Sequence, residues 1–241
     1  MRMENTKKRL PQEALKLIAC ITMLIDHFGH AIVPYLPVSY MEELYYACRI
    51  IGRIAFPIYC FLLVEGMRNT RNAGKYILRL AVGILLAELP FDILFEGGVS
   101  WESQSVMVTL TLGAVMLLCM QKTEKKWLKV LLVLPFALLA ELARCDYGAG
   151  GIVMIAVFAL FDKLILQTVA LFLVNWQLLP SAAIEIFGVV IIIQLLATLA
   201  MIPISLYNGK KLTHNKVVQW MFYLFYPVHL LILWLIFSFI R

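Results

Sequence analysis

Residues 18–30 read IACITMLIDHFGH, an apolar stretch that carries one acid and two imidazoles. An Asp at the centre of a membrane helix costs about 2.5–3.5 kcal/mol on insertion scales, so Asp26 needs a compensating partner or function. On a helix, Asp26 shares a face with His30 at spacing i,i+4, and His27 shares one with His30 at i,i+3. The stretch therefore predicts a site in which Asp26 orients an imidazole, with a purely structural polar cluster as the simpler alternative.

The whole chain is far more apolar than a soluble domain. Of its 241 residues, 62% are hydrophobic and 15% are charged, against about 45–50% and about 25% in soluble domains. The net charge of +6 is explained by the basic loops of a membrane protein, so no nucleic-acid partner is expected. The five cysteines form no CxxC pair, so neither a disulfide nor a metal site is predicted.

Apolar windows predict an all-α polytopic membrane protein, with a single transmembrane domain over 1–241 and no soluble domain. The first window is too long for a signal-peptide core and is expected to stay as a helix. About nine spans are expected from windows of sufficient length. The windows 149–162 and 163–179 form either two spans or one bent element. The spans are placed at 14–34, 45–66, 74–95, 104–121, 127–143, 149–162, 163–179, 183–206 and 216–239.

Charged residues alternate along this layout. Basic residues precede the first window and recur in every second connection, whereas the next connection holds only Glu42 and Glu43. The positive-inside rule then places the N-terminus in the cytoplasm of a multi-pass plasma-membrane protein. The basic residues that support this orientation include Arg2, Lys7, Lys8, Arg9, Arg68, Arg71, Lys75, Lys122, Lys125, Lys126, Lys129, Lys163, Lys210, Lys211 and Lys216.

The second window places two arginines on one face of a helix. Arg49 and Arg53 are spaced i,i+4, Gly52 allows a close helix contact beside them, and Pro57 frees a backbone carbonyl. Two guanidinium groups on one face can hold a phosphate or a carboxylate. Snorkelling to the outer interface is the alternative for Arg49, but it explains the deeper Arg53 less well.

A basic patch is predicted on the cytoplasmic face, after the second window. It consists of Arg68, Arg71, Lys75 and Arg79. Anionic lipid headgroups would satisfy this patch, and a phosphorylated cofactor would do so as well. Glu65 lies among these residues and is expected to pair with Arg68 or Arg71.

Further polar residues are expected on the outer side. Glu88 and Asp92 are spaced i,i+4 and suit either acid–base work or neutralisation of the arginines. Asp146 and Tyr147 belong to a glycine-rich segment that lacks the features of a nucleotide loop and forms a lid or a plain turn. His229 lies within the last apolar window. The residues expected to converge in the outer half of the membrane are Asp26, His27, Arg49, Arg53, Glu88, Asp92, Asp146 and His229.

Nearly the whole chain carries short motifs in a fixed order: MLIDH at 23–27, GRIAFP at 52–57, EG at 65–66, TR at 70–71, Tyr76, RL at 79–80, PF at 90–91, DYG at 146–148 and YPVHL at 226–230. In this combination they resemble the TraX family of integral membrane proteins. This family is linked to acetylation of pilin at its N-terminus in conjugative transfer. The pattern is also similar to the wider group of membrane O-acyltransferases that modify cell-surface glycans.

The resemblance implies an acetyl-CoA-dependent acyltransferase whose acceptor is a pilin-like peptide, a glycan or a lipid. His27 would act as general base or as covalent acyl carrier. Asp26 would orient it, and Arg53 would stabilise the oxyanion, with His229 as its possible helper. The family's adjacent Asp-His pair competes with the Asp26–His30 spacing. Residues expected to bind substrate or cofactor are Arg49, Glu65, Arg68, Arg71, Arg79, Asp92, Asp146, Tyr147 and His229.

Two other functions are compatible with the same residues. A transporter or flippase would bind a small anion or lipid at Arg49, Arg53 and His229 and relay protons through Asp26 and His27. Many such folds contain an internal repeat, and none is visible here. A non-enzymatic assembly factor would instead hold a small membrane partner through its helices.

Overall fold

The computed structural model describes residues 9–179, 182–186, 189–213 and 215–240, and this part of the chain is almost entirely helical. The basic N-terminal residues Arg2, Lys7 and Lys8 lie outside it. The helices are α1 (Gln12–Ala31), α2 (Met41–Gly52), α3 (Ala55–Asn69), α4 (Ala73–Phe95), α5 (Val106–Gln121), α6 (Lys126–Leu131), α7 (Val133–Leu142), α8 (Gly148–Leu160), α9 (Leu164–Gln177), α10 (Met201–Ser205) and α11 (Lys216–Ile240), with 3₁₀ segments η1 (Val33–Tyr35) and η2 (Ile193–Ala200).

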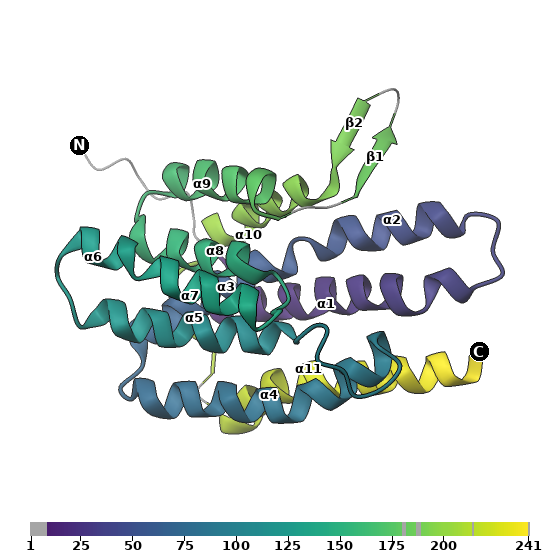
Figure 1. Cartoon of the computed structure of the whole chain (residues 1–241), viewed down its shortest axis with the longest axis horizontal. Helices are drawn as coiled ribbons and strands as arrows, with labels where there is room; N and C mark the ends of the chain where they lie inside the picture. Colours follow the sequence, from purple (N-terminus) through teal and green to yellow (C-terminus); the bar gives the residue numbers. More distant parts are fainter. Residues whose placement is uncertain (1–8, 180–181, 187–188, 214, 241) are drawn as a thin grey trace.

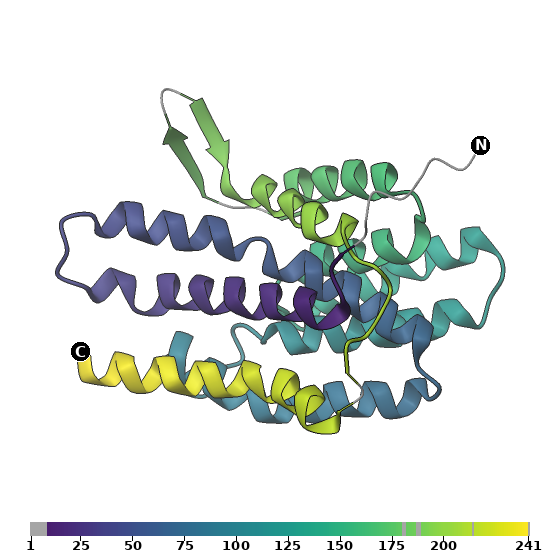
Figure 2. The same ribbon diagram turned by 180° about the vertical axis from the view of Figure 1, so that it is seen from behind.

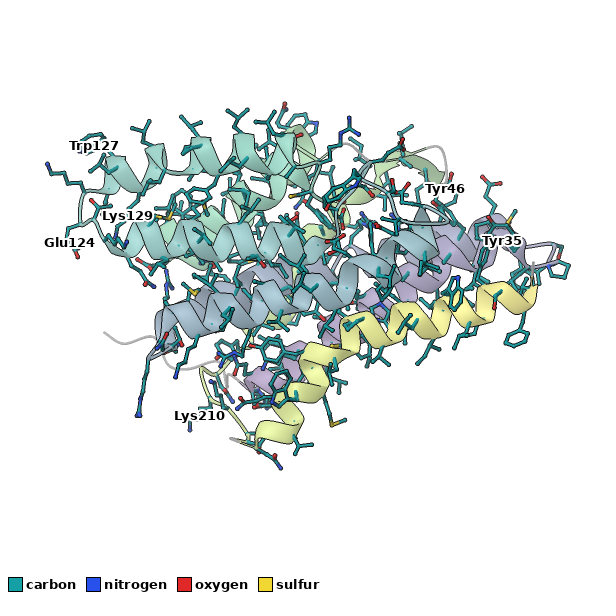
Figure 3. All side chains as sticks on the ribbon, turned by 60° about the horizontal axis from the view of Figure 1, so that its bottom comes forward. Tyr35, Tyr46, Glu124, Trp127, Lys129 and Lys210 are labelled. Carbon is teal, nitrogen blue, oxygen red and sulfur yellow. The ribbon has the colours of Figure 1, made fainter. Side chains whose placement is uncertain are left out.

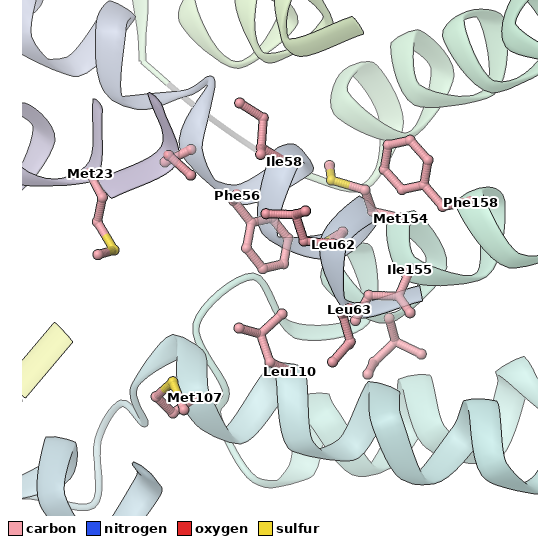
Figure 4. Close-up of a cluster of buried hydrophobic side chains, with 14 of the residues drawn as sticks. Met23, Phe56, Ile58, Leu62, Leu63, Met107, Leu110, Met154, Ile155 and Phe158 are labelled. Atoms are coloured by element: carbon pink, nitrogen blue, oxygen red, sulfur yellow. The ribbon is translucent and has the colours of Figure 1, made fainter. Parts of the chain in front are cut away.

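The helices pack around α3 (Figures 1 and 2). Helix α1 runs beside α2, and α4 runs beside α11, while α3 contacts α1, α5 and α8 between them. Large apolar side chains fill the centre, where Phe56 and Leu63 of α3 meet Leu110 of α5 and Met154 and Ile155 of α8 (Figure 4). All five of these side chains are buried.

Prolines divide two of the predicted spans. The window 45–66 becomes α2 and α3, which break at Arg53 and Ile54. A proline ring clashes with the carbonyl four residues earlier, and for Pro57 that carbonyl belongs to Arg53. Likewise, 127–143 becomes α6 and α7, which break at Leu132, three residues before Pro135.

The predicted span at 183–206 is wrong. Residues Ala183–Ile186 and Val189–Ile192 form the antiparallel strands β1 and β2, which precede η2 and α10. The hairpin projects from the helical body (Figure 1). The segment is rich in β-branched Ile and Val, which favour strands over helices. Hydropathy alone does not distinguish an apolar strand from part of a helix.

Within the described residues, three helical segments are long and apolar enough to cross a membrane: Gln12–Tyr35, Met41–Asn69 and Val217–Ile240. Shorter apolar helices include Gly148–Leu160 and Leu164–Gln177, which are separate elements and not one bent helix. The predicted count of about nine spans is therefore not confirmed, and the cytoplasmic N-terminus stays a prediction. Figure 3 places Glu124, Trp127 and Lys129 at one end of the molecule and Tyr35 and Tyr46 at the opposite end.

Close approach of α1 and α2 depends on glycine. A Cβ atom added to Gly52 would overlap the side chain of Asp26, and one added to Gly29 would overlap Cys48. The two helices therefore approach closely at Gly29 and Gly52, where no side chain keeps them apart. This crossing brings the acid of α1 to the arginines of α2.

We expect Gly52→Ala to destabilise the protein by about 1–3 kcal/mol, because the new methyl group pushes Asp26 out of place. The measurement is thermal unfolding in detergent. Gly98→Ala is the matched control, since a Cβ there meets open space. Equal unfolding midpoints for the two variants would contradict the close crossing.

Candidate functional site

The carboxylate of Asp26 lies between two guanidinium groups. Arg49 Nη1 donates to Asp26 Oδ2 at 2.8 Å, and Arg53 Nη2 donates to Oδ1 at 3.0 Å and to Oδ2 at 3.3 Å. The side chains of Asp26 and Arg53 are only 13% and 12% exposed. One acid thus pairs with two bases at this point between the helices.

The imidazole of His27 pairs with His229 and not with Asp26. His27 Nδ1 lies 2.7 Å from His229 Nε2, and His229 Nδ1 lies 2.7 Å from the carbonyl oxygen of Phe225. The carbonyl only accepts, so His229 carries a proton on Nδ1. In the neutral pair, His27 therefore donates from Nδ1 to His229, and Nε2 of His27 keeps its lone pair.

This arrangement differs from the sequence expectation. Asp26 was expected to orient an imidazole, but its hydrogen bonds within the described residues go to Arg49 and Arg53. His229 was expected to support an oxyanion donor, but it contacts His27 instead. His30 lines the same cavity and packs against Phe95 at a centroid distance of 5.4 Å.

A cavity of about 310 Å³ lies between these groups. Its wall combines charged side chains, imidazoles and aromatic rings from α1, α2, α3, α4 and the α7–α8 connection. The residues that matter most for chemistry are Asp26, His27, Arg49, Arg53, Asp146 and Tyr147. The structure therefore brings together six predicted site residues from three separate parts of the chain.

The α7–α8 connection presents Asp146 and Tyr147 to the cavity in a strained turn. Arg144 and Tyr147 have φ angles of 53° and 64°, in the left-handed region that non-glycine residues rarely adopt. The Tyr147 ring stacks on Phe56 of α3 with centroids 3.7 Å apart. Burial raises the pKa of Asp146 to about 6, although the nearby Arg53 guanidinium opposes the shift.

Two predicted outer carboxylates support loops instead of the arginines. Glu88 accepts hydrogen bonds from the backbone N–H and hydroxyl of Ser105, the N-cap residue of α5. Asp92 accepts from the Ser100 N–H at 3.1 Å. It does not line the cavity. Both residues therefore fix the connection between α4 and α5, which forms part of the cavity wall.

The predicted basic patch lies away from the cavity. Glu65 and Arg68 are near the C-terminal end of α3, a helix of 15 residues, or about 22 Å. Arg68 donates to the carbonyl of Ala159 at the end of α8 and lies 3.9 Å from Glu65. Arg71 is exposed, and Arg79 lies over the ring of Tyr76.

Sequence reasoning missed two buried amides behind Arg53. Gln194 Oε1 accepts from Arg53 Nη1 at 3.1 Å, and Gln194 Nε2 donates to Asn175 Oδ1 at 2.8 Å. Their only sequence signal is that each is a polar amide within an apolar run. Among the described residues, no group of three or more His, Cys, Asp or Glu side chains has a geometry that would hold a metal.

Comparisons with known proteins agree with the sequence motifs. A family model described as TraX protein matches residues 11–237. A probable fimbrial assembly protein, FimC of serogroup H1, from Dichelobacter nodosus is 30% identical over 231 residues, which cover 91% of this chain and 92% of that protein. Protein TraX from Escherichia coli strain K12 is 27% identical over 148 residues, or 61% of this chain and 54% of that protein. No solved structure matches the chain.

The fold and the site together define a helical membrane protein that carries an ion-paired and imidazole-bearing cavity between apolar helices. The match of the TraX family model to residues 11–237 identifies the family within this class of membrane protein. The chain belongs to the TraX family, so the resemblance seen in the sequence motifs is confirmed.

We expect Asp26→Asn to destabilise the protein by about 3–5 kcal/mol, because it leaves two partly buried guanidinium groups without their counter-charge. Thermal unfolding in detergent measures the loss. Glu65→Gln is the matched control: it removes the acid of a looser pair, in which Arg68 is 44% exposed, and should cost less than about 1 kcal/mol. A similar cost for both variants would contradict the central role of Asp26.

Asp146→Asn should change how stability depends on pH. A carboxyl whose folded-state pKa is raised to about 6 favours folding fully below about pH 4 and loses this contribution as the pH rises through 6. The Asn variant lacks this loss, so its unfolding midpoint should gain on wild type between pH 4 and 7. A difference that stays constant with pH would show that Asp146 is not held in this environment.

Proposed function

We propose that this protein is an integral membrane acyltransferase that moves an acetyl group from acetyl-CoA to an amine or hydroxyl acceptor. The observation that carries the proposal is the hydrogen-bond chain from His27 through His229 to the Phe225 carbonyl. It leaves His27 Nε2 as an unprotonated ring nitrogen beside a cavity that is also lined by the guanidinium groups of Arg49 and Arg53. A general base next to a cationic anion-stabilising group is what acyl transfer requires.

In the proposed reaction, His27 Nε2 removes a proton from the acceptor nitrogen or oxygen as this atom attacks the thioester carbonyl. The carbonyl oxygen becomes an oxyanion, which Arg53 and Arg49 stabilise. The C–S bond then breaks, and His27 returns the proton to the coenzyme A thiolate. The positive charge that develops on His27 is shared with His229, whose Nε2 accepts from Nδ1. In a second version, Nε2 itself carries the acetyl group between donor and acceptor.

The remaining residues serve position and binding in this proposal. Asp26 holds the two guanidinium groups together and so places their free N–H groups at the cavity. Asp146 and Tyr147, on their strained turn, form the wall that meets the acceptor. The name of the Dichelobacter nodosus relative, a probable fimbrial assembly protein, supports a fibre subunit as acceptor, whereas a glycan or lipid headgroup would offer the same nucleophile.

We propose that the protein lies in the plasma membrane and that the donor binds near the C-terminal end of α3, at the opposite end of this helix from the cavity. Its phosphates would interact with Arg71 and Arg79 and with Arg68, near Glu65. Because α3 separates this patch from the cavity by about 22 Å, the extended arm of acetyl-CoA must run along the helix to reach His27. Anionic lipid on the same patch would then compete with the donor.

We expect His27→Ala to lower acetyl transfer, or slow hydrolysis of labelled acetyl-CoA, by about 10²–10⁴-fold, because the general base is lost. His229→Phe should lower it by about 10–100-fold, since His27 Nδ1 loses its acceptor. The measurement uses purified protein in nanodiscs with radiolabelled acetyl-CoA.

His30→Ala is the matched control, because His30 lines the cavity without joining the hydrogen-bond chain. It should retain activity within a few-fold of wild type. Equal loss in all three histidine variants would contradict the proposed chain. Substrate flux through reconstituted protein without any acyl donor would indicate transport instead, and full biological function of His27→Ala would indicate an assembly factor.

A further inference from the structure

All three nitrogens of the Arg53 guanidinium group donate hydrogen bonds within the protein. Nε donates to the Arg49 carbonyl at 3.2 Å, Nη2 donates to both oxygens of Asp26, and Nη1 donates to Gln194. A guanidinium group has five N–H donors in a fixed plane. The two oxygens of one carboxylate lie too close together to accept both diverging N–H groups of Nη2, so Nη1 and Nη2 each keep one N–H without a partner among the described residues. With contacts on three nitrogens, the plane cannot rotate, and both of these N–H groups have fixed directions.

On the Nη1 side, Arg53 contacts the first residue of a buried relay of two amide side chains. Gln194 on η2 is 2% exposed, and Asn175 on α9 is fully buried. The donor-only guanidinium fixes the orientation of the Gln194 amide, which then donates from Nε2 to Asn175 Oδ1. Asn175 Nδ2 in turn donates to the Leu171 carbonyl at 2.8 Å. Every link therefore points away from Arg53, and the relay ends on helix backbone.

We propose that Gln194 and Asn175 are positioning residues that hold the Arg53 guanidinium so that its remaining Nη1–H meets the reaction's oxyanion. The inference rests on the proposed acyl transfer for its chemistry, although the relay itself rests only on geometry. Neither amide lines the cavity, so any effect on turnover must pass through Arg53. Asp26 restrains one edge of the guanidinium group, and Gln194 restrains the other.

The size of the expected effect follows from what an oxyanion donor contributes. Removing such a donor costs about 10²–10³-fold in kcat, and misplacing one by about 1 Å can cost about 10²-fold. Loss of the relay leaves Arg53 in place but free to rotate. We therefore expect Gln194→Leu and Asn175→Leu to lower kcat by about 10–100-fold, with KM for acetyl-CoA unchanged within about twofold.

Matched variants separate positioning from packing. Gln167→Leu is the control for Asn175→Leu, because Gln167 is also buried on α9 but, among the described residues, donates to the Phe161 carbonyl and not to the relay. It should leave kcat within about threefold of wild type. Gln194→Glu keeps an acceptor for Arg53 but loses the donor to Asn175, so it should recover part of the kcat lost in Gln194→Leu. A loss in Gln167→Leu equal to that in Asn175→Leu would overturn the proposal, as would failure of Gln194→Glu to recover activity.

A double-mutant cycle tests whether Gln194 acts through Arg53. In an Arg53→Lys background, where the fork of donors is already lost, Gln194→Leu should lower kcat by less than about threefold. A full additional loss of 10-fold or more would assign Gln194 a role independent of Arg53.

The same cycle measured on unfolding midpoints keeps the relay distinct from the enzyme function. If the wild-type protein lacks acetyl transfer, the proposed function fails. The unfolding midpoints alone then show whether Gln194 and Arg53 are coupled. Non-additive midpoints for Arg53→Lys and Gln194→Leu, beside additive midpoints for Arg53→Lys and Gln167→Leu, support it. Additive midpoints in both cycles overturn it.

Discussion

The site depends on a single carboxylate held between two guanidinium groups. Asp26 is one residue in an apolar helix, and its insertion would be costly without Arg49 and Arg53 beside it. The two arginines are equally costly without Asp26. This mutual requirement fixes the rotation of α1 against α2 and places the crossing of the two helices at Gly52, which has no side chain to separate them. The cavity lies where these three side chains meet.

Neighbouring positions on α1 then serve different networks. Successive helix residues point about 100° apart, so Asp26 faces α2 while His27 faces α11. Asp26 belongs to the charged network that extends through Arg53 to the amides of η2 and α9. His27 belongs to a separate network of imidazoles, which ends on the Phe225 carbonyl. Both networks reach the cavity wall, which is lined by His27 and by Arg53.

Sequence patterns predicted where most of the helices lie, and six of the predicted site residues line the cavity. Apolar windows located the helices because burial or lipid contact requires continuous apolar stretches, and ionisable residues within them indicated the site. They failed at 183–206, where β-branched residues form a hairpin with the same hydropathy as a helix. They also did not predict which acid pairs with which base, because Asp26, Glu88 and Asp92 offer the same charge and only packing selects among them.

The amides Gln194 and Asn175 were missed for a related reason. A neutral amide in an apolar run costs little to bury once it is hydrogen-bonded, so it gives a weaker signal than a charge. Its meaning depends on partners that lie far apart in sequence: Gln194 is 141 residues from Arg53. The His27–His229 contact, with a separation of 202 residues, was likewise visible only as two isolated imidazoles in apolar helices.

The most direct test of this account is the tautomer of His27. The protein contains four histidines, and ¹⁵N NMR of histidine-labelled protein reports which ring nitrogen of each carries a proton; His27→Gln and His229→Gln assign the signals. The account predicts that His27 and His229 are both neutral and both protonated on Nδ1, with Nε2 of His27 free. A proton on Nε2 of neutral His27 would contradict it, because this nitrogen would then be unable to accept a proton from a substrate.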